Sequence, residues 1–86
     1  MVTRVMTKED LPDRVLEIVH SLGGSGTVVE VSREFWQRHE PELRSSGDLF
    51  YTWQYELRWA AQHLRDSGRL AATGRGASSR WALPTI

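Results

Sequence analysis

The 86-residue sequence contains no cysteine. This absence excludes disulfide bonds, catalysis by a thiol and zinc sites built on thiolates. The sequence also has no apolar run near the roughly 20 residues that cross a bilayer, and its first residues, MVTRVMTKED, lack a signal-peptide core. We therefore expect a cytoplasmic protein that does not associate with a membrane.

The chain also lacks an excess of positive or negative charge, because 11 basic residues balance 11 acidic ones. The balance is uneven along the chain. Residues 1–47 hold six basic and eight acidic residues, a net −2, and residues 48–86 hold five and three, a net +2. This weak dipole does not predict strong non-specific binding to polyanions.

Motifs that carry catalysis are absent as well. His20, His39 and His63 lack the spacing of metal ligands, and no phosphate-binding loop, nucleophile motif or carboxylate pair is visible. We expect no catalytic residue, no metal site and no cofactor. The protein is therefore not expected to be an enzyme.

The first helix is predicted over residues 11–22, where apolar residues recur at helical spacing. Thr7 and Asp10 resemble a capping pair before it, and Pro12 suits its first turn. Glycines at positions 23, 24 and 26 then end the helix.

The second helix is predicted from about Val28, because Thr27 and Glu30 form a T-x-x-E capping box. β-Branched residues leave a short strand near Thr27 as a competing interpretation. We expect the helix to end near Glu40, since the residue before Pro41 is disfavoured in the helical conformation, with one further turn as an alternative.

The third helix is predicted to follow Asp48, a suitable N-cap residue, and to stop at Gly68. At about 100° per residue, one face of this helix is apolar throughout and is expected to be buried. That face consists of Phe50, Trp53, Leu57, Ala60, Ala61 and Leu64.

A β-hairpin is predicted after the third helix. Residues 69–73 and 80–83 alternate between polar and apolar, and residues 74–79 have the composition of a turn. Three helices followed by a two-stranded hairpin is the element order of a winged helix. We predict an α+β, mostly α, winged helix-turn-helix fold in a single domain over residues 1–86, with residues 1–6 as a flexible or packing arm and 84–86 as a tail.

The third helix is the natural candidate to enter a DNA major groove. Arg58 and Gln62 lie four residues apart on its exposed side, and their side chains suit guanine and adenine respectively. Other candidate DNA-binding residues are expected to contact the phosphate backbone, near the helix start or on the wing. They are Tyr51, Thr52, Tyr55, Arg75 and Arg80.

A second interpretation gives this surface no role in DNA binding. Arg58 and Gln62 then form an ordinary solvated helix face, and Arg75 keeps a turn soluble. Trp59 projects away from the predicted core stripe, which suits a partner or dimer patch or packing against the N-terminal arm. Glu56 and Asp66 border the exposed strip and would oppose phosphate.

Residues 53–70 have the pattern W-x-x-x-L-x-W-A-x-x-x-L-x-x-x-G-x-L, and the hairpin ends in R-W-A-L. This resembles the N-terminal winged-helix domain of Mrr-type restriction proteins, in which F-x-x-R-V-x-W-A-x-x-Y-L-x-x-x-G-L-L precedes a hairpin ending in G-V-W-R-L-T. The glycine break, the capping box and the Ser-Gly loop extend the similarity to residues 9–83. The matching residues are Trp53, Leu57, Trp59, Ala60, Leu64, Gly68, Leu70, Trp81 and Leu83.

The resemblance implies DNA binding, since such domains are taken to steer an attached nuclease toward methylated targets. Three features depart from the family pattern: Glu56 replaces an arginine, His63 replaces a tyrosine, and the wing is longer. No nuclease domain follows before Ile86, so we do not expect this chain to cut DNA.

The function expected from the sequence is double-stranded DNA binding, by a small transcription regulator or a DNA-targeting module. The alternative is a protein-interaction or homodimerising winged helix that uses Tyr55 and Trp59.

Overall fold

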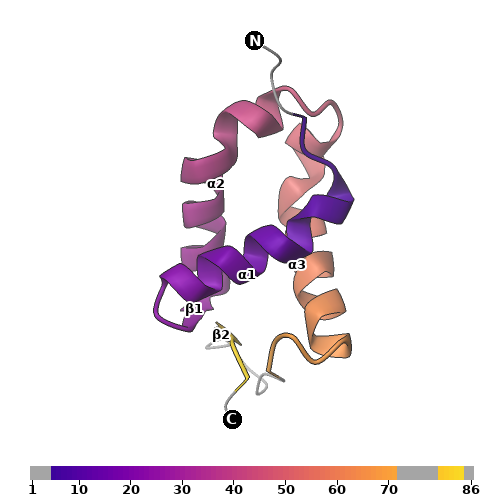
Figure 1. Ribbon diagram of the computed structural model, residues 1–86. Helices are drawn as coiled ribbons and strands as arrows, with labels where there is room; N and C mark the ends of the chain where they lie inside the picture. The colour runs from indigo at the N-terminus through magenta and orange to yellow at the C-terminus, as the bar shows by residue number, and fades with distance from the viewer. Residues whose placement is uncertain (1–4, 72–79, 85–86) are drawn as a thin grey trace.

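The computed structural model describes residues 5–71 and 80–84. Figure 1 shows α1 lying across α2 and α3, with β1 and β2 together near the end of α1. The described part of the chain is mainly helical with a two-stranded antiparallel sheet, which confirms the α+β, mostly α, class. The elements are a 3₁₀ turn η1 (Lys8–Asp10), helix α1 (Leu11–Ser21), strand β1 (Ser25–Thr27), helices α2 (Val28–Arg44) and α3 (Leu49–Asp66), and strand β2 (Arg80–Ala82).

The start and end of α1 follow the predicted signals. The Asp10 carboxylate accepts a hydrogen bond from the Thr7 N–H at 2.9 Å, which caps the η1 turn that leads into α1. Pro12 lies in the first turn of α1, where its missing N–H costs no helical bond. Gly23 and Gly24 have φ values of +92° and +106°, which L-residues rarely adopt. The chain therefore leaves the helix there and enters β1.

The capping box at the start of α2 is confirmed. The Thr27 hydroxyl accepts from the Glu30 N–H at 3.1 Å, and the Glu30 carboxylate accepts from the Thr27 N–H at 2.8 Å. Thr27 is also the last residue of β1, so strand and helix join without a loop. The short strand near Thr27 is thus present beside the helix and does not replace it.

The predicted end of the second helix near Glu40 is wrong, because α2 continues through Pro41 to Arg44. Proline removes one backbone donor, but the turn around it is supported by the Arg44–Glu40 ion pair at 2.7 Å. The fully buried side chain of Leu43 draws this turn into the core. In Figure 1 the last turns of α2 lean toward α3, as expected for a helix that contains proline.

The buried face of α3 agrees with the prediction at Leu57, Ala60, Ala61 and Leu64. Phe50 and Trp53 are only half-buried, since both rings pack against Trp36 at the edge of the core. The core that this face joins includes Met6, Leu11, Val15, Ile18, Val19, Val31, Phe35, Leu43, Leu49, Leu70 and Trp81.

Asp48 does not cap α3 with its side chain, which corrects the prediction. Its backbone is already helical, with φ −61° and ψ −26°, and its carboxylate makes no capping hydrogen bond. Carbonyl groups of the preceding turn accept instead. The Leu49 N–H donates to the Ser46 oxygen at 3.3 Å, and the Phe50 N–H donates to the Gly47 oxygen at 3.1 Å. At the other end Gly68 has the expected positive φ, +79°.

The sheet differs from the predicted hairpin. β2 pairs with β1, so that Gly26 lies opposite Trp81, whereas residues 69–71 do not form a strand. The Ala71 N–H still donates to the Ala82 oxygen at 2.9 Å. Residues 72–79, which include Arg75 and most of the predicted wing, lie outside the described residues.

Thr27→Ala is expected to lower the free energy of unfolding by about 1 kcal/mol, because α2 loses its N-cap acceptor. Urea unfolding followed by circular dichroism measures the change. Thr52→Ala is the matched control, since Thr52 is exposed on α3 and makes only a 3.4 Å bond to the Asp48 oxygen. Equal losses in the two variants would contradict the role of the capping box.

Glu30 predicts a pH dependence of stability. The backbone hydrogen bond from Thr27, then its side-chain bond and the charges of Arg80 and Arg33, hold the pKa of the Glu30 carboxyl below its ordinary 4.5. Its stabilisation is therefore complete above pH 4.5 and is lost as the pH falls through the lower folded value.

The variant Glu30→Gln keeps an acceptor without the charge. The difference in unfolding free energy between the wild type and this variant should be full at neutral pH and should shrink below pH 4.5. Urea titrations across the acidic range measure it. A difference that stays constant with pH would show that ionised Glu30 does not stabilise the fold.

Candidate functional site

Four predicted residues form one exposed strip along α3. Tyr51, Tyr55, Arg58 and Gln62 follow one another at spacings of three or four residues, which places them on the same side of a helix. Tyr51 is 82% exposed and Tyr55 is 73% exposed. We call these four residues the α3 strip. Thr52 is also exposed, beside the strip.

Arg58 is the cation of the α3 strip. It is exposed, and it makes neither a hydrogen bond nor an ion pair with any residue that the structure describes. Other arginines are engaged, for example Arg44 with Glu40 at 2.7 Å and Arg38 with Glu34 at 2.9 Å. The five-donor guanidinium of Arg58 is thus available to an external acceptor.

Gln62 is not available in the same way. Its amide Nε2 donates to the Asp66 carboxylate at 2.9 Å, and its Oε1 accepts from Arg65 at 3.3 Å. Both ends of the amide are therefore used within α3. The bonds to Asp66 and Arg65 use one N–H and one oxygen lone pair, so they fix the orientation of the amide and leave one donor and one acceptor site for a ligand.

The predicted wing residues have different positions. Arg80 lies on β2, with its guanidinium 3.4 Å from the Ser25 hydroxyl and 3.8 Å from the Glu30 carboxylate. Its side chain is half exposed, so these contacts do not shield it from a ligand. Arg75 lies outside the described residues.

Trp59 lies against the N-terminal segment. It is half-buried, with the Lys8 ammonium 4.2 Å from its ring centroid and the His63 ring stacked on it at 5.5 Å. Lys8 also approaches the Glu56 carboxylate at 3.5 Å, and the Glu56 side chain is only 16% exposed. Both residues therefore lie on the η1 side of α3. Glu56 is less exposed to a ligand on the α3 strip than the sequence suggested.

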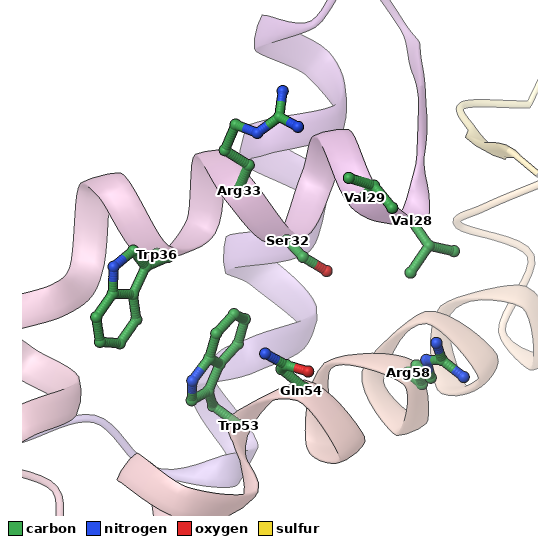
Figure 2. A pocket seen from close by; sticks show the side chains of 8 residues that line it. All are labelled: Val28, Val29, Ser32, Arg33, Trp36, Trp53, Gln54 and Arg58. Carbon is green, nitrogen blue, oxygen red and sulfur yellow. The ribbon is translucent and has the colours of Figure 1, made fainter.

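A groove between α2 and α3 was not predicted. It encloses about 580 Å³. Figure 2 shows Trp36 and Trp53 at one end, with Ser32 and Gln54 facing each other beside them. Val29 is 63% exposed at the first turn of α2. The described residues that line it are Val28, Val29, Ser32, Arg33, Trp36, Trp53, Gln54 and Arg58. We call it the α2–α3 groove.

The sequence contained one signal for this groove. Val29, Ser32, Arg33 and Trp36 recur at helical spacing on the side of α2 next to Val31 and Phe35, which lie in the core. Val29 and Trp36 place two apolar side chains in this row, and contiguous apolar surface is typical of an interaction site. The position of α3 opposite this row is what the sequence pattern did not contain.

A smaller hollow adjoins the groove. It shares Val28 and Arg58 with the groove and is also lined by Gln62, Arg65 and Trp81. Arg65 contributes an Nε that is buried without a hydrogen-bond partner among the described residues. No carboxylate appears among the described residues that line either hollow. The described lining of the two hollows therefore carries three arginines and no acid, and the nearby Asp66 carboxylate is hydrogen-bonded to Gln62 at 2.9 Å.

Within residues 5–71 and 80–84, no group of three or more histidine, aspartate and glutamate side chains is placed to hold a metal ion. The same residues contain no helix with the length and apolar character needed to cross a membrane.

Comparisons of the chain with models of known protein families, with characterised proteins and with solved structures give no significant match.

Proposed function

We propose that the chain binds double-stranded DNA as a winged helix-turn-helix domain, with α3 in the major groove and the wing on the phosphate backbone. The observation that carries the proposal is the exposed Arg58 guanidinium on the α3 strip, which has no partner among the described residues. A bidentate contact between arginine and guanine is the commonest specific contact in the major groove.

The arrangement of the elements also supports the proposal. α2 and α3 follow each other through a short loop, as in a helix-turn-helix, and α1 packs against both. β2 and the hydrogen bond between Ala71 and Ala82 lie where the base of a wing would be. The resemblance of residues 9–83 to the winged-helix domain of Mrr-type restriction proteins implies the same function.

The proposed roles divide the residues into two groups. Arg58 contacts guanine, and Gln62 contacts adenine through the N–H and the oxygen lone pair that its bonds to Asp66 and Arg65 leave unused. The remaining residues hydrogen-bond or neutralise phosphates, which positions α3 without reading sequence. They are Tyr51, Thr52, Tyr55, Arg75 and Arg80. The protein would act in the cytoplasm as a small regulator or a DNA-targeting module.

The charge of the surface sets the expected strength of binding. Asp66 lies next to Gln62 on α3, and the chain has no net charge, so a single copy would make few phosphate contacts. Each neutralised phosphate contributes to affinity through counterion release. Binding by one domain is therefore expected to be modest and to weaken steeply with added salt.

A second candidate function is association with another protein or a second copy of the chain. Tyr51 and Tyr55 are large, strongly exposed side chains one helical turn apart, and tyrosine is frequent in interface hot spots. In this proposal Tyr55 and the exposed part of Trp59 form the contact. Sedimentation at increasing protein concentration tests it, and Tyr55→Ala is expected to reduce any self-association.

Arg58→Ala is expected to weaken binding to a selected duplex by about tenfold or more, because a bidentate base contact contributes roughly 1–3 kcal/mol. Selection from a randomised duplex pool, followed by affinity measurement, gives both the preferred sequence and its strength. The variant should also lose the guanine preference of the wild type. Arg14→Ala is the control, since Arg14 lies on α1, outside the α3 strip, and pairs with Glu17.

Arg75→Ala combined with Arg80→Ala is expected to weaken binding to all duplexes alike, because these residues are proposed to contact phosphates. The dependence of affinity on salt should fall by about one phosphate contact for each arginine removed. Titrations at several salt concentrations measure this slope. Unchanged duplex affinity in both the Arg58 and the wing variants would overturn the proposed mode of binding.

A further inference from the structure

We propose that the α2–α3 groove binds an acidic amphipathic helix of a partner protein. In this complex the apolar side chains of the partner helix fill the groove, and its carboxylates pair with Arg33 and Arg58. This surface is distinct from the Tyr55–Trp59 patch, and the proposal does not require that the protein bind DNA.

The shape and lining of the groove suit a helical ligand. Two helices form its walls, and Val28, Val29, Trp36 and Trp53 give it apolar contact surface. Such grooves bind one face of an amphipathic helix through anchors at positions i, i+3 or i+4 and i+7. Val29 is the most exposed of the four, so a partner side chain can reach the groove without rearrangement of the core.

The positive charge of the groove favours a partner helix that carries acidic side chains. Arg33 stands on the outer side of α2 and Arg58 on α3, and no carboxylate lines the groove among the described residues. Arg58 has no partner there, while Arg33 has only the longer-range attraction of Glu30. Arg65, with its unpartnered Nε, continues the basic surface in the adjoining hollow. A partner with glutamates or aspartates beside its apolar anchors is complementary to this arrangement.

Single-stranded nucleic acid is another anionic ligand with apolar surfaces, and the ring contacts in the groove disfavour it. Base stacking needs an open aromatic face. Trp53 already packs nearly parallel to Phe35 at 5.5 Å and to Trp36 at 5.7 Å, and Trp36 also contacts Phe50 and the Arg44 guanidinium. These contacts cover ring faces of Trp36 and Trp53 on which a base would have to stack. Aliphatic side chains of a partner helix need only the ring edges of the two tryptophans and the side chains of the valines.

One consequence rests on the proposed function. Arg58 belongs both to the α2–α3 groove and to the α3 strip, so an acidic helix that pairs with it would compete with duplex DNA. The partner would then regulate DNA binding by occupying the same guanidinium. Docking and competition are separate measurements, so one can fail without the other.

The test uses a synthetic helical peptide of about 15 residues, long enough to form a helix, with leucine anchors at i, i+3 and i+7 and flanking glutamates. A second peptide carries lysine at every glutamate position. Nuclear magnetic resonance of the full chain follows the four tryptophan indole N–H signals. The acidic peptide should shift the signals of Trp36 and Trp53 and leave that of Trp59 in place, and the lysine peptide should bind at least about tenfold more weakly.

Val29→Glu is expected to weaken the acidic peptide about tenfold or more, since it places a carboxylate in the groove. The change suits the first turn of α2, where acidic residues favour the helix dipole, so the variant should remain folded. Val5→Glu is the matched control because Val5 is similarly exposed but lies outside the groove. It should bind the peptide as the wild type does.

The inference would be overturned if the acidic peptide caused no shift at about 1 mM, a concentration that would detect even a millimolar Kd. Equal binding of the two peptides would also overturn it. So would an equal effect of the two valine variants on binding of the acidic peptide. Stronger shifts of Trp36 and Trp53 with oligodeoxythymidine than with the acidic peptide would assign the groove to single-stranded DNA instead. Peptide binding without any duplex binding would support the groove and reject the proposed function. Duplex binding without peptide binding would do the reverse.

Discussion

The junction between β1 and α2 is the constraint on which most of the described structure depends. Thr27 closes the strand and caps the helix through reciprocal hydrogen bonds with Glu30, so the directions of the two elements are linked. Gly26 makes the junction tight, since a Cβ there would lie 2.8 Å from Leu22 Cδ1 and 3.3 Å from Val31 Cγ2. Opposite Gly26, β2 places Trp81 in the core. A change at this junction therefore affects the sheet, the core and the position of α2 together.

The surface of α3 follows from what the core requires of the same helix. Leu57, Ala60, Ala61 and Leu64 are buried against the rest of the core, and this leaves the opposite side of α3 in solvent. The α3 strip is that side. The start of α2 lies beside α3 at Arg58, one residue of that strip. Val28 and Arg33 therefore line one wall of the α2–α3 groove, and Arg58 lines the other. One arginine thereby belongs to both surfaces, so ligands of the two surfaces are coupled through it.

Local features were predictable from the sequence, and features set by tertiary contacts were not. The Thr27–Glu30 box and the glycine stops depend on residues next to each other in the chain, and both are present as expected. Pro41 was given too much weight, because burial of Leu43 outweighs the loss of one backbone donor. The pairing of β1 with β2 joins residues more than 50 positions apart, which alternation alone cannot register. Of the candidate site, the spacing along α3 was predictable. The hydrogen bonds that hold Gln62 join it to Arg65 and Asp66, three and four residues later on the same helix, so the sequence carried a signal for them that was not used. The groove between α2 and α3 depends on tertiary neighbours that the pattern does not contain.

The central claim is that the α3 strip contacts duplex DNA, and an amide-shift titration tests it most directly. Isotope-labelled protein is titrated with mixed-sequence duplex at two salt concentrations. We expect shifts concentrated at Tyr51, Tyr55, Arg58 and Gln62 that diminish as salt increases, because phosphate contacts release counterions. An absence of shifts at low salt, or shifts concentrated on α1 with the α3 strip unchanged, would contradict it.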